Sequence, residues 1–149
     1  MRREGGEDME QDVFLVAYDG RDQHPVDFAV SRALKENARL LVVHVLEWSP
    51  YSFLTTAELA ERHKTRQQEL ARAEEQLMKP ILEKVRGAGV TAEGELRYGD
   101  VDDLICSIAK EKSTAMIFVG RSSSISTRVF GSVASGVAQC APVPVVIVP

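Results

Sequence analysis

The sequence predicts an α/β protein built on an open parallel β-sheet with helices on both faces. Three observations lead to this prediction. The apolar runs at residues 13–17, 40–46, 116–119 and 143–148 are short and rich in β-branched side chains, as in strands that are buried on both faces. Segments with helical periodicity separate these runs. Such connections form right-handed crossovers, so we expect consecutive strands to lie parallel.

The first half of the chain predicts two strands and two helices. After the strand at 13–17, apolar residues recur at helical spacing from Val26 to Leu34, and Pro25 suits the first turn of that helix. The strand at 40–46 is followed by a looser stretch and then by a long helix over about 55–86. Pro80 lies inside this helix and should kink or split it, because proline donates no backbone hydrogen bond.

The second half predicts three strands and two further helices. Residues 91–97 alternate and carry charge, so we place this strand at an edge of the sheet. Asp100 is expected to cap the next helix. The strand at 116–119 ends at Gly120, a polar loop follows, and a short helix at 132–139 precedes the final strand.

Length and composition favour one domain at 13–149 that follows a flexible polar tail at 1–12. The chain has 149 residues and a net charge of −4, so we expect neither a nucleic-acid surface nor a membrane surface. We find no targeting segment. Cys106 and Cys140 show no metal-ligand spacing and no disulfide framework, so we expect a cytoplasmic protein with reduced thiols.

Two predicted strand ends could form a binding site. Ligands of open α/β sheets bind at the carboxyl ends of strands, where Asp19 and Gly120 fall here. Gly131 and Ser132 open the following helix, whose free N–H groups suit a phosphate. The residue pattern equally fits a plain turn at Asp19 and a helix cap at Ser132. For His44 in its apolar strand, we favour a structural histidine bonded to the backbone.

The order of several short motifs resembles the universal stress protein family. These motifs are Asp19-Gly20 after the first strand, the strand LVVHV, Gly99-Asp100 before a helix, and the ending VGR…GSV…APVPVVIV. The resemblance covers almost the whole chain beyond the tail. It implies an adenine nucleotide alpha hydrolase-like fold with five parallel strands in the order 3-2-1-4-5. It also implies a homodimer through the final strand, which begins at Val143 and ends at Val148.

The resemblance further implies a site for ATP or AMP, with or without Mg²⁺. Many members carry the motif G-x2-G-x9-G-[ST] after the fourth strand. Here Ser123 replaces the second glycine, and seven residues rather than nine separate it from Gly131. A phosphate loop shortened in this way can either keep or lose the nucleotide. The residues matched to the family's nucleotide site are Asp19, Val45, Val119, Gly120, Ser123, Gly131, Ser132 and Val133.

Three functions therefore stay open. The first is an ATP- or AMP-binding dimeric regulator of the stress response, and the second is a nucleotide-free homodimer that acts through protein partners. The third is an enzyme of a related α/β fold. We rank the enzyme last because the sequence lacks both a P-loop and the S-G-G-x-D-S loop of ATP pyrophosphatases. We assign no catalytic residue and expect at most weak ATP hydrolysis or self-phosphorylation.

Overall fold

A computed structural model describes residues 11–47, 55–121 and 132–149, and it contains the predicted open sheet. Five parallel strands lie in the order β3-β2-β1-β4-β5, as expected. The strands are β1 (Val13–Ala17), β2 (Arg39–Glu47), β3 (Ala92–Gly99), β4 (Met116–Gly120) and β5 (Val145–Val148). The helices are α1 (His24–Glu36), α2 (Thr56–Ala73), α3 (Lys79–Gly87), α4 (Val101–Glu111) and α5 (Ser132–Cys140), with a π-helical turn, η2 (Glu74–Met78), between α2 and α3.

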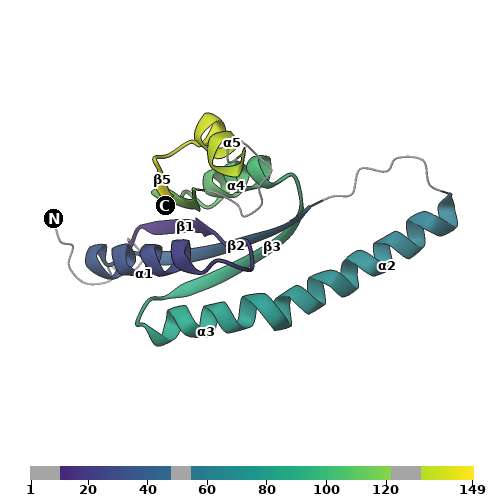
Figure 1. Ribbon diagram of the computed structural model, residues 1–149, viewed down its shortest axis with the longest axis horizontal. Coiled ribbons are helices and arrows are strands. Elements are labelled where there is room, and N and C mark those ends of the chain that lie inside the picture. The colour runs from purple at the N-terminus through teal and green to yellow at the C-terminus, as the bar shows by residue number, and fades with distance from the viewer. Residues whose placement is uncertain (1–10, 48–54, 122–131) are drawn as a thin grey trace.

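Helices cover both faces of the sheet (Figure 1). α1 and α3 lie on one face, where Phe14 and Val16 are buried. α4 and α5 lie on the other face, where the neighbouring Leu15 is buried. Successive side chains of a strand point to opposite faces, so each inner strand contributes to two separate cores. This double burial explains why the central strands read as unbroken apolar runs.

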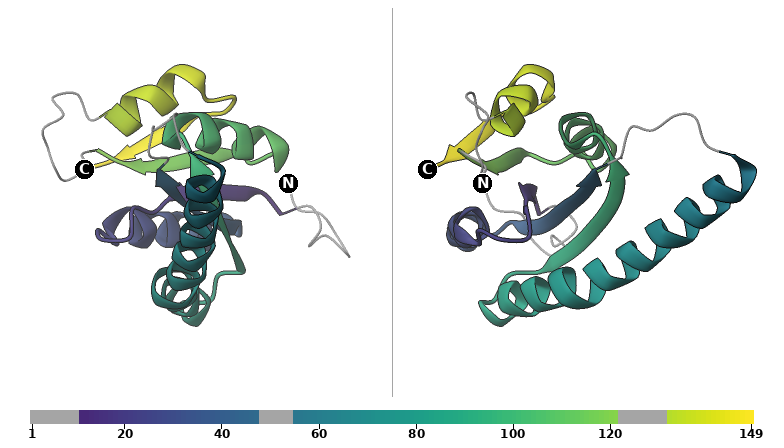
Figure 2. Two further views of the ribbon diagram at one scale, coloured as in Figure 1. Left: turned by 90° about the vertical axis from the view of Figure 1, so that its right-hand side faces the viewer. Right: turned by 45° about the vertical axis from the view of Figure 1, so that its right-hand side comes forward.

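The long helical segment changes its hydrogen-bond pattern just before Pro80, where a kink or split was predicted. The five-residue π-helical turn η2 comes directly before α3, and the Lys79 N–H donates to the carbonyl of Glu74. A π-turn changes the hydrogen-bond register at a place where Pro80 offers no N–H. The two α-helices nevertheless form one long rod, and α2 extends well past the sheet (Figures 1 and 2).

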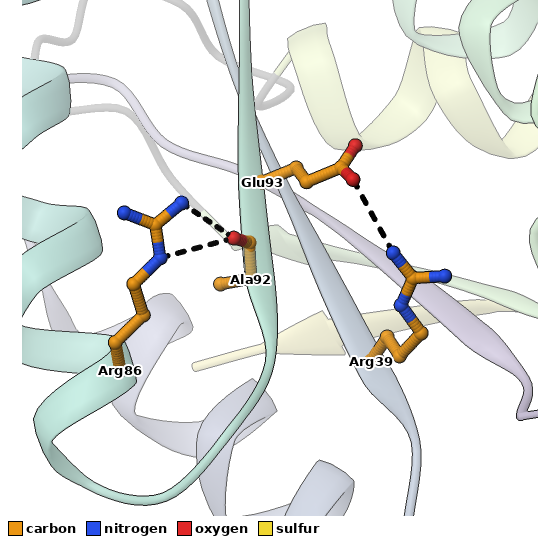
Figure 3. A network of polar contacts seen from close by, with 4 residues as sticks. All are labelled: Arg39, Arg86, Ala92 and Glu93. Atoms are coloured by element: carbon orange, nitrogen blue, oxygen red, sulfur yellow. Dashed lines mark hydrogen bonds and ion pairs between the residues drawn. The ribbon is translucent and has the colours of Figure 1, made fainter. Parts of the chain in front are cut away.

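The predicted edge strand is β3, and polar contacts cover its beginning (Figure 3). The Nε and Nη2 atoms of Arg86 donate to the carbonyl oxygen of Ala92 at 3.1 and 2.7 Å. This carbonyl points away from β2, since the neighbouring Thr91 carbonyl is the one that accepts from Leu40 of β2. On the other side, Arg39 of β2 pairs with Glu93 at 3.3 Å. Arg86 thus satisfies an edge carbonyl that another strand could otherwise use.

The final strand is shorter than predicted. We expected it to begin at Val143, but β5 begins at Val145. The Pro144 carbonyl accepts a hydrogen bond from the N–H of Ile117 of β4, but proline has no N–H to donate.

Within the described residues, no helix is long and apolar enough to cross a membrane.

The expectation of reduced thiols is wrong for this structure. Cys106 of α4 and Cys140 of α5 form a disulfide, with Cα atoms 6.0 Å apart. The two cysteines are 34 residues apart in sequence, and only the packing of α4 against α5 brings them together. Sequence spacing therefore gave no sign of the bond. In the chain-entropy estimate, a cross-link of this span stabilises the fold by about 3–4 kcal/mol.

Candidate functional site

The strand order reverses between β1 and β4, and this is where α/β sheets bind ligands. α1, which follows β1 in the chain, lies on one face of the sheet, and α5, which follows β4, lies on the other (Figure 2). The end of β4 and the start of α1 lie very close together, because a Cβ added at Gly120 would lie 3.2 Å from Cγ of Pro25. Gly120 therefore lets the start of α1 approach the end of β4.

Asp19 caps the turn that follows β1. Its Oδ1 accepts hydrogen bonds from the backbone N–H groups of Arg21 at 2.8 Å and Asp22 at 3.0 Å. Gly20 follows with a φ of +89°, a conformation that other residues rarely adopt. The turn role considered for Asp19 is thus confirmed. Its contact with a nucleotide stays a prediction.

His44 is the backbone-bonded histidine that the sequence predicted. It is buried, and its Nδ1 lies 2.8 Å from the carbonyl oxygen of Tyr18. Because a carbonyl only accepts, we assign the proton to Nδ1. The last backbone hydrogen bond between the β1 and β2 chain segments runs from the Tyr18 N–H to the Val43 carbonyl. The next bond of the ladder would use the Tyr18 carbonyl oxygen, but His44 already bonds to it.

This contact leaves the backbone of Val45 open on its β1 side. The groups of Val43 face β1, and backbone groups alternate along a strand, so those of Val45 face the same way. β1 pairs with β2 only as far as Val43, and the described residues show no backbone hydrogen bond from Val45 to β1. The Val45 side chain is half-buried against the α4–α5 core. A donor and an acceptor are therefore available near the carboxyl end of β2, beside β1.

The remaining matched residues divide into two groups. Val119 is fully buried, and Val133 in the first turn of α5 packs against the same core. These two side chains hold the start of α5 on β4. Ser132 opens α5 as predicted, but its side chain lies outside the description. Ser123 and Gly131 also lie outside the described residues.

The sequence did not indicate that two further residues lie near the switch point. Pro25 was interpreted only as a helix start, and Leu77 falls within the long helix predicted over about 55–86. In the structure, Cδ1 of Leu77 would lie 3.2 Å from a Cβ at Gly20. The π-helical turn gives Leu77 this position, and no sequence pattern shows such a turn in advance.

The electrostatics differ between the two sides of the switch point. Burial raises the pKa of the Asp102 carboxyl, and the nearby charges of Asp100, Asp103 and Glu47 raise it further. These acids lie where β2 ends and α4 begins, and they disfavour a phosphate there. The free N–H groups at the start of α5 suit a phosphate better, although the Asp102 carboxylate packs against Gly136, one turn further along this helix. Within the described ranges, no three His, Cys, Asp or Glu side chains are grouped to hold a metal ion.

A five-stranded parallel sheet with helices on both faces and a switch point between β1 and β4 defines a doubly wound α/β fold. The chain belongs to the universal stress protein family, whose family model matches residues 12–149. A comparison with curated proteins finds no match.

Solved structures of the same family share the fold. Universal stress protein UspA from Lactobacillus plantarum has a TM-score of 0.80 and 24% identity, covering 93% of this chain and 97% of the other. A universal stress protein in complex with cAMP has a TM-score of 0.64 and 23% identity, covering 93% and 96%. One from Archaeoglobus fulgidus in complex with dAMP has a TM-score of 0.64 and 21% identity, covering 93% and 98%.

Proposed function

We propose that this chain binds an adenine nucleotide, ATP or AMP, at the carboxyl ends of β1 and β4. The observation that carries the proposal is the open backbone of Val45 beside the switch point. Adenine presents a donor at N6 and acceptors on its ring, so it can pair with one N–H and one C=O. The complexes of two structural neighbours with cAMP and dAMP support the same class of ligand.

The phosphates would lie at the start of α5. The helix begins at Ser132, directly after the loop that carries Ser123 and Gly131. Free N–H groups and the helix dipole favour an anion at this end, and serine hydroxyls add donors. Since the described residues group no metal ligands, Mg²⁺ would be held mainly by the phosphates.

In the cell, we propose a cytoplasmic homodimer that regulates the stress response according to its bound nucleotide. The alternative is a nucleotide-free homodimer that acts through protein partners. Two observations favour the alternative: the shortened loop with Ser123, and the engagement of Asp19 Oδ1 in its own turn. Both functions require the same fold, so only a binding measurement separates them.

Calorimetry with ATP and with AMP tests the proposal on the wild type and three variants. Gly131→Val places a branched side chain where the backbone should approach a phosphate, and we expect affinity to fall at least about tenfold. Asp19→Asn keeps an oxygen for the two turn N–H groups, but it removes the charge and replaces the second acceptor oxygen with an NH₂ group. It should therefore weaken nucleotide binding while leaving the thermal midpoint unchanged.

Gly87→Ala is the matched control, because a Cβ at Gly87 would meet nothing within 4 Å. It should bind as the wild type does. Equal affinity of the wild type and Gly131→Val, with circular dichroism unchanged, would reject the phosphate site. Wild-type protein that binds neither nucleotide would favour the nucleotide-free function.

A further inference from the structure

We propose that the Cys106–Cys140 disulfide is a reversible redox site that dithiol reductants open and that controls how firmly α5 and β5 are held on the sheet. The bond joins the second turn of α4 to the last residue of α5. Residues 141–144 then lead directly into β5. The disulfide is thus a fixed point between the last helix and the last strand.

The two sulfur atoms differ in access. Cys106 is buried beneath α5, with 8% of its surface exposed, whereas Cys140 is exposed to solvent. An external thiolate therefore reaches Cys140 Sγ first. Because attack at one sulfur expels the other, Cys106 is the leaving group of the first step.

Reduction then proceeds as two exchange steps. The thiolate of a dithiol forms a bond to Cys140 Sγ, the protein S–S bond breaks, and its electron pair stays on Cys106, which takes up a proton. The second thiol of the reductant displaces the Cys140 thiolate and closes the reductant's own disulfide. Two electrons and two protons pass from the dithiol to the protein. An oxidised disulfide such as oxidised glutathione reverses both steps.

The fold has acceptors for both thiols of the reduced state. Cys106 Sγ lies 3.7 Å from the carbonyl oxygen of Val137, and Cys140 Sγ lies 3.7 Å from that of Asp102. Each oxygen belongs to the opposite helix, so a thiol could donate across the helix pair. Ala134 and Val137 are buried in the core that α4 and α5 form on the sheet, and we expect this packing to remain without the bond. Reduction should consequently loosen this segment and leave the rest of the sheet intact.

The C-terminal segment depends on the bond more than the centre of the sheet does. α5 has nine residues, too few to be stable as an isolated helix. β5 has four residues and is an edge strand whose sheet neighbour is β4. In cytoplasmic proteins, the location expected here, disulfides are usually transient or redox-sensing.

Hydrogen exchange followed by mass spectrometry tests the proposal on the full chain, before and after treatment with dithiothreitol. We expect amides of α5 and β5 to exchange on the order of 10-fold faster after reduction, with β1 and β2 unchanged. The thermal midpoint should fall on the order of 10 °C. Oxidised glutathione should restore both values.

Two exposed neighbours in α5 provide the variant and its control. Cys140→Ser should show the faster exchange with or without reductant, whereas Gln139→Ser should respond as the wild type does. Alkylation of both thiols before any reductant is added would show that the bond does not form and would overturn the proposal. Equal exchange in α5 before and after reduction, or faster exchange throughout the sheet, would overturn it as well.

Discussion

The two edges of the sheet are built from opposite chemistry. β3 is eight residues long and contains Glu93, Glu95 and Arg97, and the long rod of α2 and α3 lies beside it (Figure 1). β5 is four residues long and contains only Val and Ile. Its Ile147 leaves 46% of its surface exposed. Only one of these edges is suited to a second chain.

The β3 edge is closed by charges and by side-chain hydrogen bonds. Arg97 pairs with Glu95 at 2.7 Å and with Glu111 of α4 at 3.6 Å, and all three side chains reach solvent. A chain that covered this edge would have to remove these charges from water, which is costly. Arg86 already satisfies the edge carbonyl of Ala92. Charged side chains and the Arg86 hydrogen bonds therefore protect this long edge from pairing with another strand.

The β5 edge has no charged side chain. The carbonyl oxygens of Val148 and Pro144 accept hydrogen bonds from the N–H groups of Arg121 and Ile117, so they face β4. Because backbone groups alternate along a strand, those of Val145 and Ile147 point to the outer side of the sheet. Pro144 and Pro149 flank the strand and limit any added ladder to a few rungs. A two-fold contact needs only one short self-complementary patch. The comparison supports the proposed homodimer, in which β5 would pair with β5 of a second copy.

The largest expected effect is the loss of the proposed dimer in Ile147→Glu. Two carboxylates would face each other near the two-fold axis, and we expect the dimer to weaken by about 100-fold or more. Light scattering at micromolar concentration should show half the wild-type mass. Leu59→Glu is the control, because Leu59 is similarly exposed but lies in α2. A wild type that is already monomeric would contradict the dimer.

A smaller effect is expected at the inner face of β3, where Gly94→Val should destabilise the fold. A Cβ at Gly94 would lie 2.4 Å from Met78 Sδ and 2.7 Å from its Cγ, so the buried methionine would have to move. We expect the free energy of unfolding in urea to fall by about 2–3 kcal/mol. Gly87→Ala, with open space around its added Cβ, should match or slightly exceed the wild type. Equal midpoints for Gly94→Val and the wild type would mean that α3 does not hold this edge tightly.

The smallest effect concerns Tyr98 at the end of β3. Its hydroxyl donates to Glu69 of α2, and the Arg66 guanidinium carbon lies 5.5 Å from the ring centroid. Burial, followed by the hydrogen bond and charge of Glu69, raises the pKa of Tyr98 to about 12, against an opposing contribution from Arg66.

The neutral phenol is thus the form that the fold favours. Its contribution to stability is fully present below about pH 10, the unfolded value, and is lost as the pH rises towards 12. An ultraviolet titration should show one tyrosine that ionises late, and Tyr98→Phe should abolish that step. At neutral pH this variant should lose about 1 kcal/mol. An unchanged titration would show that α2 does not pack on this edge in solution.

Sequence patterns located most helices and strands along the chain, but they did not predict the order of the strands in the sheet. Helical spacing from Val26 to Leu34 located α1, and charge alternation at residues 91–97 indicated an edge strand. The order 3-2-1-4-5 came from the family resemblance, because local periodicity says nothing about which strands are neighbours. Asp19 and Gly120 were placed at strand ends from sequence alone. Their joint position at the switch point depends on the strand order.

The sequence by itself determined what is local in this protein: strand and helix periods, a disturbance of the long helix near Pro80, and the contrast between a charged edge and an apolar one. Tertiary structure decided every feature that joins distant residues. These features include the Cys106–Cys140 disulfide, the Arg86 contact with Ala92, and the Leu77 contact with Gly20. Periodicity is set by backbone geometry within a few residues, whereas these contacts depend on how the helices pack on the sheet.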